Sequence, residues 1–279
     1  MSTSAVVTYW FVSALDSATV LATEARADRG FGRKYLAQLN PSWPITTIGQ
    51  FPLNRSSQAS AGEFYIGGYP GVTVVQTWID DIGLLAETDP DMLSSRPAPD
   101  VYVIAVGDDS DFGGFAHFSG GVLKRCLSGT REFLTEDIGL PEPFEAPYWA
   151  GETTEPRGGI SLPFEPRDIA RAAERAWVGV DVSPEGPDIQ VVGYAVDGRP
   201  EPRIEEPRKV GKEKLTPSGV EIVAYDDYEI QPAEREGDEF VRLAEAAGAA
   251  FRRVSRTVRR RAGDMRESIT ERIRHSDRP

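Results

Sequence analysis

The stretch EFYIGGYPGVTVVQTW, residues 63–78, predicts a β-hairpin and with it a sheet. Apolar and β-branched residues, which favour strands, lie on both sides of Pro70-Gly71. Proline presets φ for the first central position of a type II turn, and glycine accepts the positive φ of the second. The two arms are therefore expected to pair antiparallel.

Similar runs predict further strands on both sides of this hairpin. Short apolar runs bounded by turn residues are typical of buried strands. They occur at residues 5–12, 45–51, 101–106 and 188–196. We therefore expect an α+β fold with a mixed, largely antiparallel sheet and a few packing helices.

A second hairpin is expected at residues 112–127, FGGFAHFSGGVLKRCL, with Gly120-Gly121 as its two-residue turn. That turn sets His117 opposite Lys124. In this register His117 and Cys126 lie on one face, at a diagonal separation of about 7–8 Å. The pair is either a thiol–imidazole site or ordinary cross-strand packing.

Two helical regions are expected between the strands. Residues 16–39 form the first, with Asp16 or Ser17 as the N-cap, and Gly30 and Gly32 are expected to break it into two pieces. Residues 165–178 form the second, because small and apolar residues recur along one side.

The segment between them, residues 129–165, is Pro-rich and is expected to be irregular. Its aromatic residues Phe144, Tyr148 and Trp149 have two interpretations. They either anchor the loop by packing against the body, or they form an exposed binding surface.

Two motifs in the chain carry a family resemblance. EDIGLPEPFEAPYWAGE at residues 136–152 and YIGGYPGVTVV at residues 65–75 resemble motifs of an actinobacterial domain family of unknown function. The resemblance covers roughly residues 5–200. It implies a bacterial, cytoplasmic domain and implies no particular activity.

Carboxylates between two predicted strands are weak catalytic or metal-ligating candidates. Asp108 and Asp111 supply oxygen ligands of the kind that Ca²⁺ or Mg²⁺ prefers, but aspartate is also common in turns. An enzyme with a carboxylate-lined cleft would bring Asp111, His117 and Glu136 together.

Composition excludes several classes of site. The single cysteine cannot form an intramolecular disulfide or a cysteine-ligated structural zinc site. No Walker A loop or dinucleotide-binding glycine motif is present, so we expect no cofactor. No apolar run approaches the roughly 20 residues of a membrane-spanning helix, and we expect a cytoplasmic protein.

The C-terminal part differs from the rest in charge. The net charge is −13, whereas residues 252–279 contain 10 arginines and 4 acidic residues. We expect a body at residues 1–197 and a Pro- and charge-rich linker at 198–232, with a possible short strand at 219–225. A long basic amphipathic helix is expected at 233–275.

This predicted helix is the main indication of function. Its apolar stripe excludes Arg256 and Arg260 and includes Phe251, Val254, Val258, Met265 and Ile269. A narrow stripe favours a helical protein partner or self-association. The arginines leave an anionic membrane surface, nucleic acid or the chain's own acidic body as alternatives. The sequence therefore favours a non-catalytic binding or adaptor protein, with an unidentified enzyme as the alternative.

Overall fold

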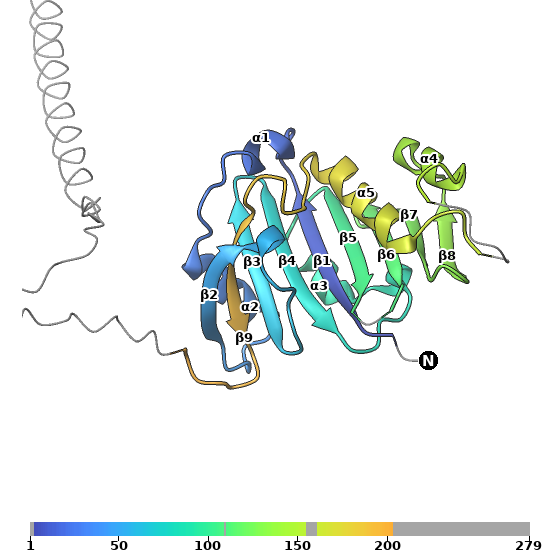
Figure 1. Ribbon diagram of the computed structural model, residues 1–279. Coiled ribbons are helices and arrows are strands. Elements are labelled where there is room, and N and C mark those ends of the chain that lie inside the picture. The colour runs from blue at the N-terminus through green and yellow to red at the C-terminus, as the bar shows by residue number, and fades with distance from the viewer. Residues whose placement is uncertain (1–2, 109, 155–160, 203–279) are drawn as a thin grey trace, which may run out of the picture. The chain divides into compact units, whose positions relative to one another are not determined.

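One antiparallel sheet organises the computed structural model, which describes residues 3–108, 110–154 and 161–202. Within these residues, nine strands lie in the order β2-β9-β3-β4-β1-β5-β6-β7-β8, and all neighbours are antiparallel (Figure 1). The α+β class is confirmed, but the sheet is not mixed in this part of the chain. The strands are β1 (Ala5–Val12), β2 (Thr46–Pro52), β3 (Glu63–Tyr69), β4 (Val72–Ile79), β5 (Asp100–Gly107), β6 (Gly113–Ser119), β7 (Val122–Gly129), β8 (Leu134–Gly139) and β9 (Gln190–Ala195).

Short helices and loops cover both faces of the sheet. The α2 face carries α2 (Arg29–Leu39), η2 (Leu85–Glu87) and α3 (Pro90–Ser94). The α5 face carries α1 (Ser17–Leu21), η1 (Leu53–Arg55), η3 (Pro143–Glu145), α4 (Ala146–Trp149) and α5 (Pro166–Val178). Figure 1 shows α5 lying across β5 and β6.

Strand β1 shows how two cores form from one sheet. Successive side chains of a strand point to opposite faces. Val7, Tyr9 and Phe11 accordingly belong to the core on the α2 face, and Trp10 and Val12 belong to the core on the α5 face. Because both faces are covered, all eight residues of β1 are buried, as its continuous apolar run predicted.

The first predicted hairpin is confirmed, and the second needs a correction. Gly71 has φ of 74° in the β3–β4 turn, as a type II turn requires. In the β6–β7 hairpin a bulge shifts the register between His117 and Phe118, so His117 lies opposite Arg125 rather than Lys124. This shift by one residue places His117 and Cys126 on opposite faces of the sheet.

The first helical region is interrupted at a different place from the one predicted. Its first helix, α1, ends at Leu21, and its second helix, α2, begins at Arg29. Gly30 and Gly32 therefore lie inside α2. The Asp28 carboxylate caps α2 by accepting from the Gly30 amide at 2.7 Å. Gly32 is needed for close packing, because an added Cβ would lie 2.4 Å from the Tyr194 ring.

The Pro-rich segment holds a strand that the sequence did not predict. Residues 134–139 form β8 and pair with β7, and η3 and α4 follow. The sequence did not predict this strand because it contains Glu136 and Asp137, and acidic residues are uncommon in β-strands. The structure gives both carboxylates hydrogen-bond donors, as described below.

The predicted C-terminal elements lie outside the described residues. These are the possible strand at 219–225, the helix at 233–275 and most of the linker at 198–232. They stay predictions. Among the helices that the structure does describe, none has the length and apolar character needed to cross a membrane.

Candidate functional site

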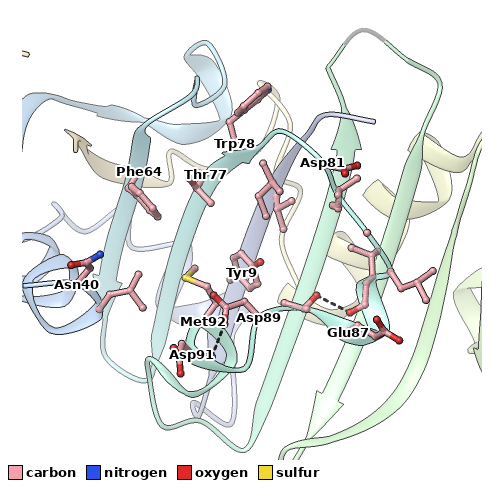
Figure 2. Close-up of a pocket in the computed structure, with 18 of the residues that line it drawn as sticks. Tyr9, Asn40, Phe64, Thr77, Trp78, Asp81, Glu87, Asp89, Asp91 and Met92 are labelled. Atoms are coloured by element: carbon pink, nitrogen blue, oxygen red, sulfur yellow. Dashed lines mark hydrogen bonds between the residues drawn. The ribbon is translucent and has the colours of Figure 1, made fainter. Parts of the chain in front are cut away.

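A cavity of about 580 Å³ lies on the α2 face, between the sheet and the segment that follows β4 (Figure 2). Its floor is a row of side chains on three neighbouring strands. Val7 of β1 pairs with Thr77 of β4, which pairs with Phe64 of β3. All three line the cavity, so its floor is set by the register of the sheet.

Tyr9 is the polar group at the bottom of the cavity. The residue is only 1% exposed, and Figure 2 shows its side chain among those that line the pocket. Within the described residues its hydroxyl makes no hydrogen bond. Burial raises the pKa of Tyr9, and the negative charge of Asp89 and the nearby Tyr35 raise it further. The hydroxyl therefore stays protonated at neutral pH.

One wall is the segment after β4, and a buried carboxylate fixes it. Glu136 of β8 accepts hydrogen bonds from the backbone amides of Leu85 and Ala86, both at 2.9 Å. The Ser128 hydroxyl donates to the same carboxylate at 2.5 Å. These bonds satisfy the free amides at the start of η2. Glu136 is thus a capping group that holds the pocket wall against the sheet.

Helix α3 continues this wall. Asp89 is its N-cap and accepts from the Asp91 amide at 2.9 Å, and Pro90 occupies the first turn, where its missing N–H is not needed. Met92 is buried and faces the cavity. The opposite wall includes Trp43, whose ring packs against Phe64 with centroids 5.2 Å apart.

The charge of the pocket has one sign. No Lys, Arg or His lines it, and its mouth carries four exposed carboxylates. In the described parts of the chain, none of the four forms an ion pair. They are Asp81, Glu87, Asp89 and Asp91. The cavity can therefore bury apolar groups of a ligand, and the potential at its mouth opposes an anion.

The predicted carboxylate candidates lie elsewhere. Asp108 is exposed at the end of the β5 segment, and Asp111 accepts from the Arg131 amide at 2.9 Å. Asp111 thus acts as a turn-stabilising group. Neither residue lines the pocket described here.

The structure does not bring His117 and Cys126 together. His117 Nε2 lies 3.0 Å from Asp100 Oδ1 on the α5 face, and its ring packs against Tyr102 with centroids 4.9 Å apart. Cys126 is fully buried on the α2 face, where burial raises the pKa of its thiol. The same separation of faces rules out a cleft lined jointly by His117 and Glu136.

The three aromatic residues of the Pro-rich segment pack against the α5 face. Phe144 contacts Phe115 at a centroid distance of 5.7 Å, and Trp149 contacts Phe164 at 4.9 Å. Tyr148 also packs on Phe164. These contacts are those of a loop anchor. The interpretation as a binding surface stays a prediction.

A metal centre would need several ligating side chains to converge among the described residues. Among them, no group of three or more His, Cys, Asp or Glu residues has an arrangement that could hold a metal ion. The predicted association residues lie outside the described part of the chain. They are Phe251, Val254, Arg256, Val258, Arg260, Met265 and Ile269.

Residues 6–194 match the model of a family of unknown function (DUF6928). The match covers more than half of the chain. The chain belongs to this family. The DUF6928 region includes the complete pocket lining, from Val7 to Met92, so the pocket is part of the family domain in this chain. Searches of curated proteins and of solved structures found no match.

The pocket could not be predicted from the sequence, although the strands β1, β3 and β4 that form its floor were predicted. Its residues come from β1, the end of α2, β3, β4 and the segment from Asp81 to Met92. The one local signal was the density of carboxylates beside apolar residues in that segment. Their convergence depends on strand order, which no local pattern contains.

Proposed function

We propose that this protein is a binding protein whose DUF6928 domain holds a ligand with a large apolar part in the pocket on the α2 face. The observation that carries the proposal is the cavity of about 580 Å³ over an apolar floor. Small-molecule sites are typically concave, largely apolar and of about 300–1,000 Å³. The floor belongs to the sheet, so the site is formed before a ligand arrives.

The chemistry of the lining supports binding rather than catalysis. A catalytic nucleophile needs an adjacent base, and a general acid or base needs a pKa near the working pH. The lining contains no His, Lys or Cys, and the carboxylates at the mouth are exposed. Tyr9 has a raised pKa and stays protonated. A ligand held here meets groups that orient it.

Binding is tested with Nile red, a neutral dye that fluoresces in apolar surroundings, on the full chain. Gly83 lines the pocket, and an added Cβ there meets no heavy atom within 4 Å. Because Gly83 is exposed at the edge of the pocket, Gly83→Trp should add an indole there without a clash and should weaken dye binding. Leu15→Trp is the matched control, because Leu15 is fully exposed and does not line the pocket. Equal dye binding by the native chain and Gly83→Trp would contradict the proposal.

The same proposal gives residues 233–275 a second binding role. We propose that this segment associates with a helical protein partner or with a second copy of the chain. The support is its apolar stripe, since burying a side chain such as Val258 or Ile269 contributes roughly 1.5–3 kcal/mol. Exposed arginine–carboxylate pairs contribute at most about 1 kcal/mol each.

Substitutions separate these contributions. Val258→Asp or Ile269→Asp should abolish association in sedimentation or pull-down measurements, and Arg256→Gln with Arg260→Gln should weaken it only slightly. If the arginine changes eliminate association and salt reverses it, the segment is an electrostatic arm. Liposome sedimentation and a DNA shift assay then distinguish an anionic membrane surface from nucleic acid.

We further propose an actinobacterial, cytoplasmic protein. The motif at residues 136–152 supports the first part. The single cysteine, a buried free thiol, suits a reducing compartment.

A further inference from the structure

Two kinds of side chain that attract cations meet in the pocket. Four aromatic residues line it: Tyr9, Trp43, Phe64 and Trp78. Four carboxylates lie along the wall that follows β4, and no basic side chain of the lining neutralises them. The face of an aromatic ring carries negative charge density, so it attracts a cation in the same place where the carboxylates do.

Tyr9 provides an independent indication of a polar ligand. A tyrosine hydroxyl can both donate and accept a hydrogen bond, so one that lines a cavity can bind a polar group of a ligand. Tyr9 is 1% exposed, lines the cavity and, among the described residues, has no hydrogen-bond partner. Its hydroxyl is placed to bind a group of a ligand that occupies the cavity.

Asp89 lines the same pocket as Tyr9. Its charge is the largest electrostatic contribution to the raised pKa of Tyr9, after burial itself. Figure 2 shows both side chains at the same part of the pocket. A donor placed here would meet the Tyr9 oxygen as an acceptor and the Asp89 carboxylate as a counter-ion.

We propose that the pocket recognises an organic ammonium ion that carries an aromatic or bulky apolar group. The ammonium group donates to Tyr9 Oη and is balanced by Asp89, and the apolar group lies on the floor of Val7, Phe64 and Thr77. This inference rests on the proposed binding function and adds the charge class of the ligand. A bare metal ion fits less well, because the floor is apolar and no three ligating residues converge in the described chain.

The test uses three indole compounds of similar size and different charge, titrated calorimetrically into the full chain. Tryptamine carries an ammonium group, skatole is neutral, and indolepropionate is an anion. Tryptamine should bind most tightly and indolepropionate most weakly. The preference should shrink as salt rises from about 0.05 M to about 0.5 M, because exposed carboxylates are screened.

Two variants test the residues without disturbing the fold. Tyr9→Phe removes only a hydroxyl that has no partner, and it should weaken tryptamine binding about tenfold while leaving skatole binding unchanged. Tyr194→Phe is its control, because the Tyr194 hydroxyl donates to the Arg29 carbonyl oxygen at 2.6 Å, outside the pocket.

Asp89→Asn removes the charge and keeps the helix cap, since asparagine caps about as well as aspartate. It should weaken tryptamine binding by up to about fivefold, as expected for an exposed ion pair. Asp16→Asn is the matched control, because Asp16 caps α1 by accepting from the Thr19 amide at 2.9 Å and does not line the pocket.

The outcomes distinguish this inference from the proposed function. Equal binding of all three compounds, weakened by Gly83→Trp, would overturn the charge class and leave the binding function standing. Failure of Tyr9→Phe and Asp89→Asn to reduce the preference for tryptamine would overturn the assigned residues. If neither Nile red nor any of the indoles binds, both proposals fail.

Discussion

The Arg125 guanidinium donates to both carboxylate oxygens of Glu145, from Nε at 2.8 Å and from Nη2 at 2.7 Å. The two side chains are 1% and 0% exposed. Arg125 belongs to β7 and Glu145 to the segment after β8, so one buried ion pair ties the Pro-rich segment to the sheet. Trp149 Nε1 donates to the same carboxylate at 3.1 Å.

Glu145→Gln should destabilise the protein by about 3–5 kcal/mol, because it leaves the buried Arg125 charge without its main partner. Urea unfolding measures this loss. Asp137→Asn is the control: Asp137 also pairs with Arg125 but is 43% exposed. It should cost about 1 kcal/mol or less. Equal losses in the two variants would show that Arg125 depends no more on Glu145 than on Asp137.

Two glycines of α2 should respond oppositely to alanine. Gly32→Ala should destabilise by about 1–3 kcal/mol, because its Cβ overlaps the Tyr194 ring. At Gly30 the nearest atom to an added Cβ is Asp28 Oδ1, at 3.3 Å, so the end of this exposed side chain has to shift by a few tenths of an ångström. Gly30→Ala should therefore be neutral, or stabilising by up to about 1 kcal/mol through helix propensity. Thermal melting compares the two; a gain at Gly32 would contradict the packing described for α2.

The Cys126 thiol should be inert in the folded protein. It is fully buried, and burial raises its pKa well above the usual range, so almost no thiolate forms at neutral pH. A thiol-specific disulfide reagent should react only after denaturant is added. The fully unfolded chain supplies the reference rate, and rapid reaction without denaturant would contradict the burial of β7.

Stability should fall in alkaline solution. Burial raises the pKa of Tyr35, Tyr102 and Tyr194 to about 12, against about 10 in the unfolded chain. The folded state thus favours the protonated form, and this stability is complete below pH 10 and is lost between about pH 10 and pH 12. Melting temperatures and tyrosinate absorbance across this range test the prediction. Full ionisation of these residues near pH 10 without unfolding would refute it.

A chain ended at residue 208 should fold alone and melt cooperatively. All nine strands of the described structure and both apolar cores lie before that point, as does Arg199, whose guanidinium lies 2.6 Å from Glu63 Oε1. Circular dichroism and calorimetry of the shortened chain measure this. A broad, non-cooperative transition would show that residues 209–279 contribute to the core.

The sequence predicted most strands because their signal is local. Runs such as residues 5–12 are apolar apart from Thr8, and glycine pairs such as Gly120-Gly121 mark a turn directly. Strand β8 was missed because Glu136 and Asp137 interrupt the apolar pattern, and their partners, the η2 amides and Arg125, are distant in sequence. The bulge beside Phe118 was missed for a similar reason, because its flanking residues fit either register.

The candidate site was less predictable than the fold. The predicted pair of His117 and Cys126 depended on an unbroken register, and one extra residue moved the two side chains to opposite faces. The pocket depends on β1 lying between β4 and β5, which places Val7 beside Thr77. Strand order depends on the packing of the whole sheet, so it cannot be predicted from local sequence patterns.

Strand β9 has a consequence for how the protein is made. It is the last strand in the described sequence, yet it lies between β2 and β3, so Gln190 pairs with Pro52. During synthesis, β2 and one edge of β3 therefore lack their partner strand β9 until nearly the whole domain has been made. Unpaired edges of this kind invite pairing between nascent chains, and such long-range pairing is slow. The sheet is therefore completed between β2 and β3 only after β9 has been made.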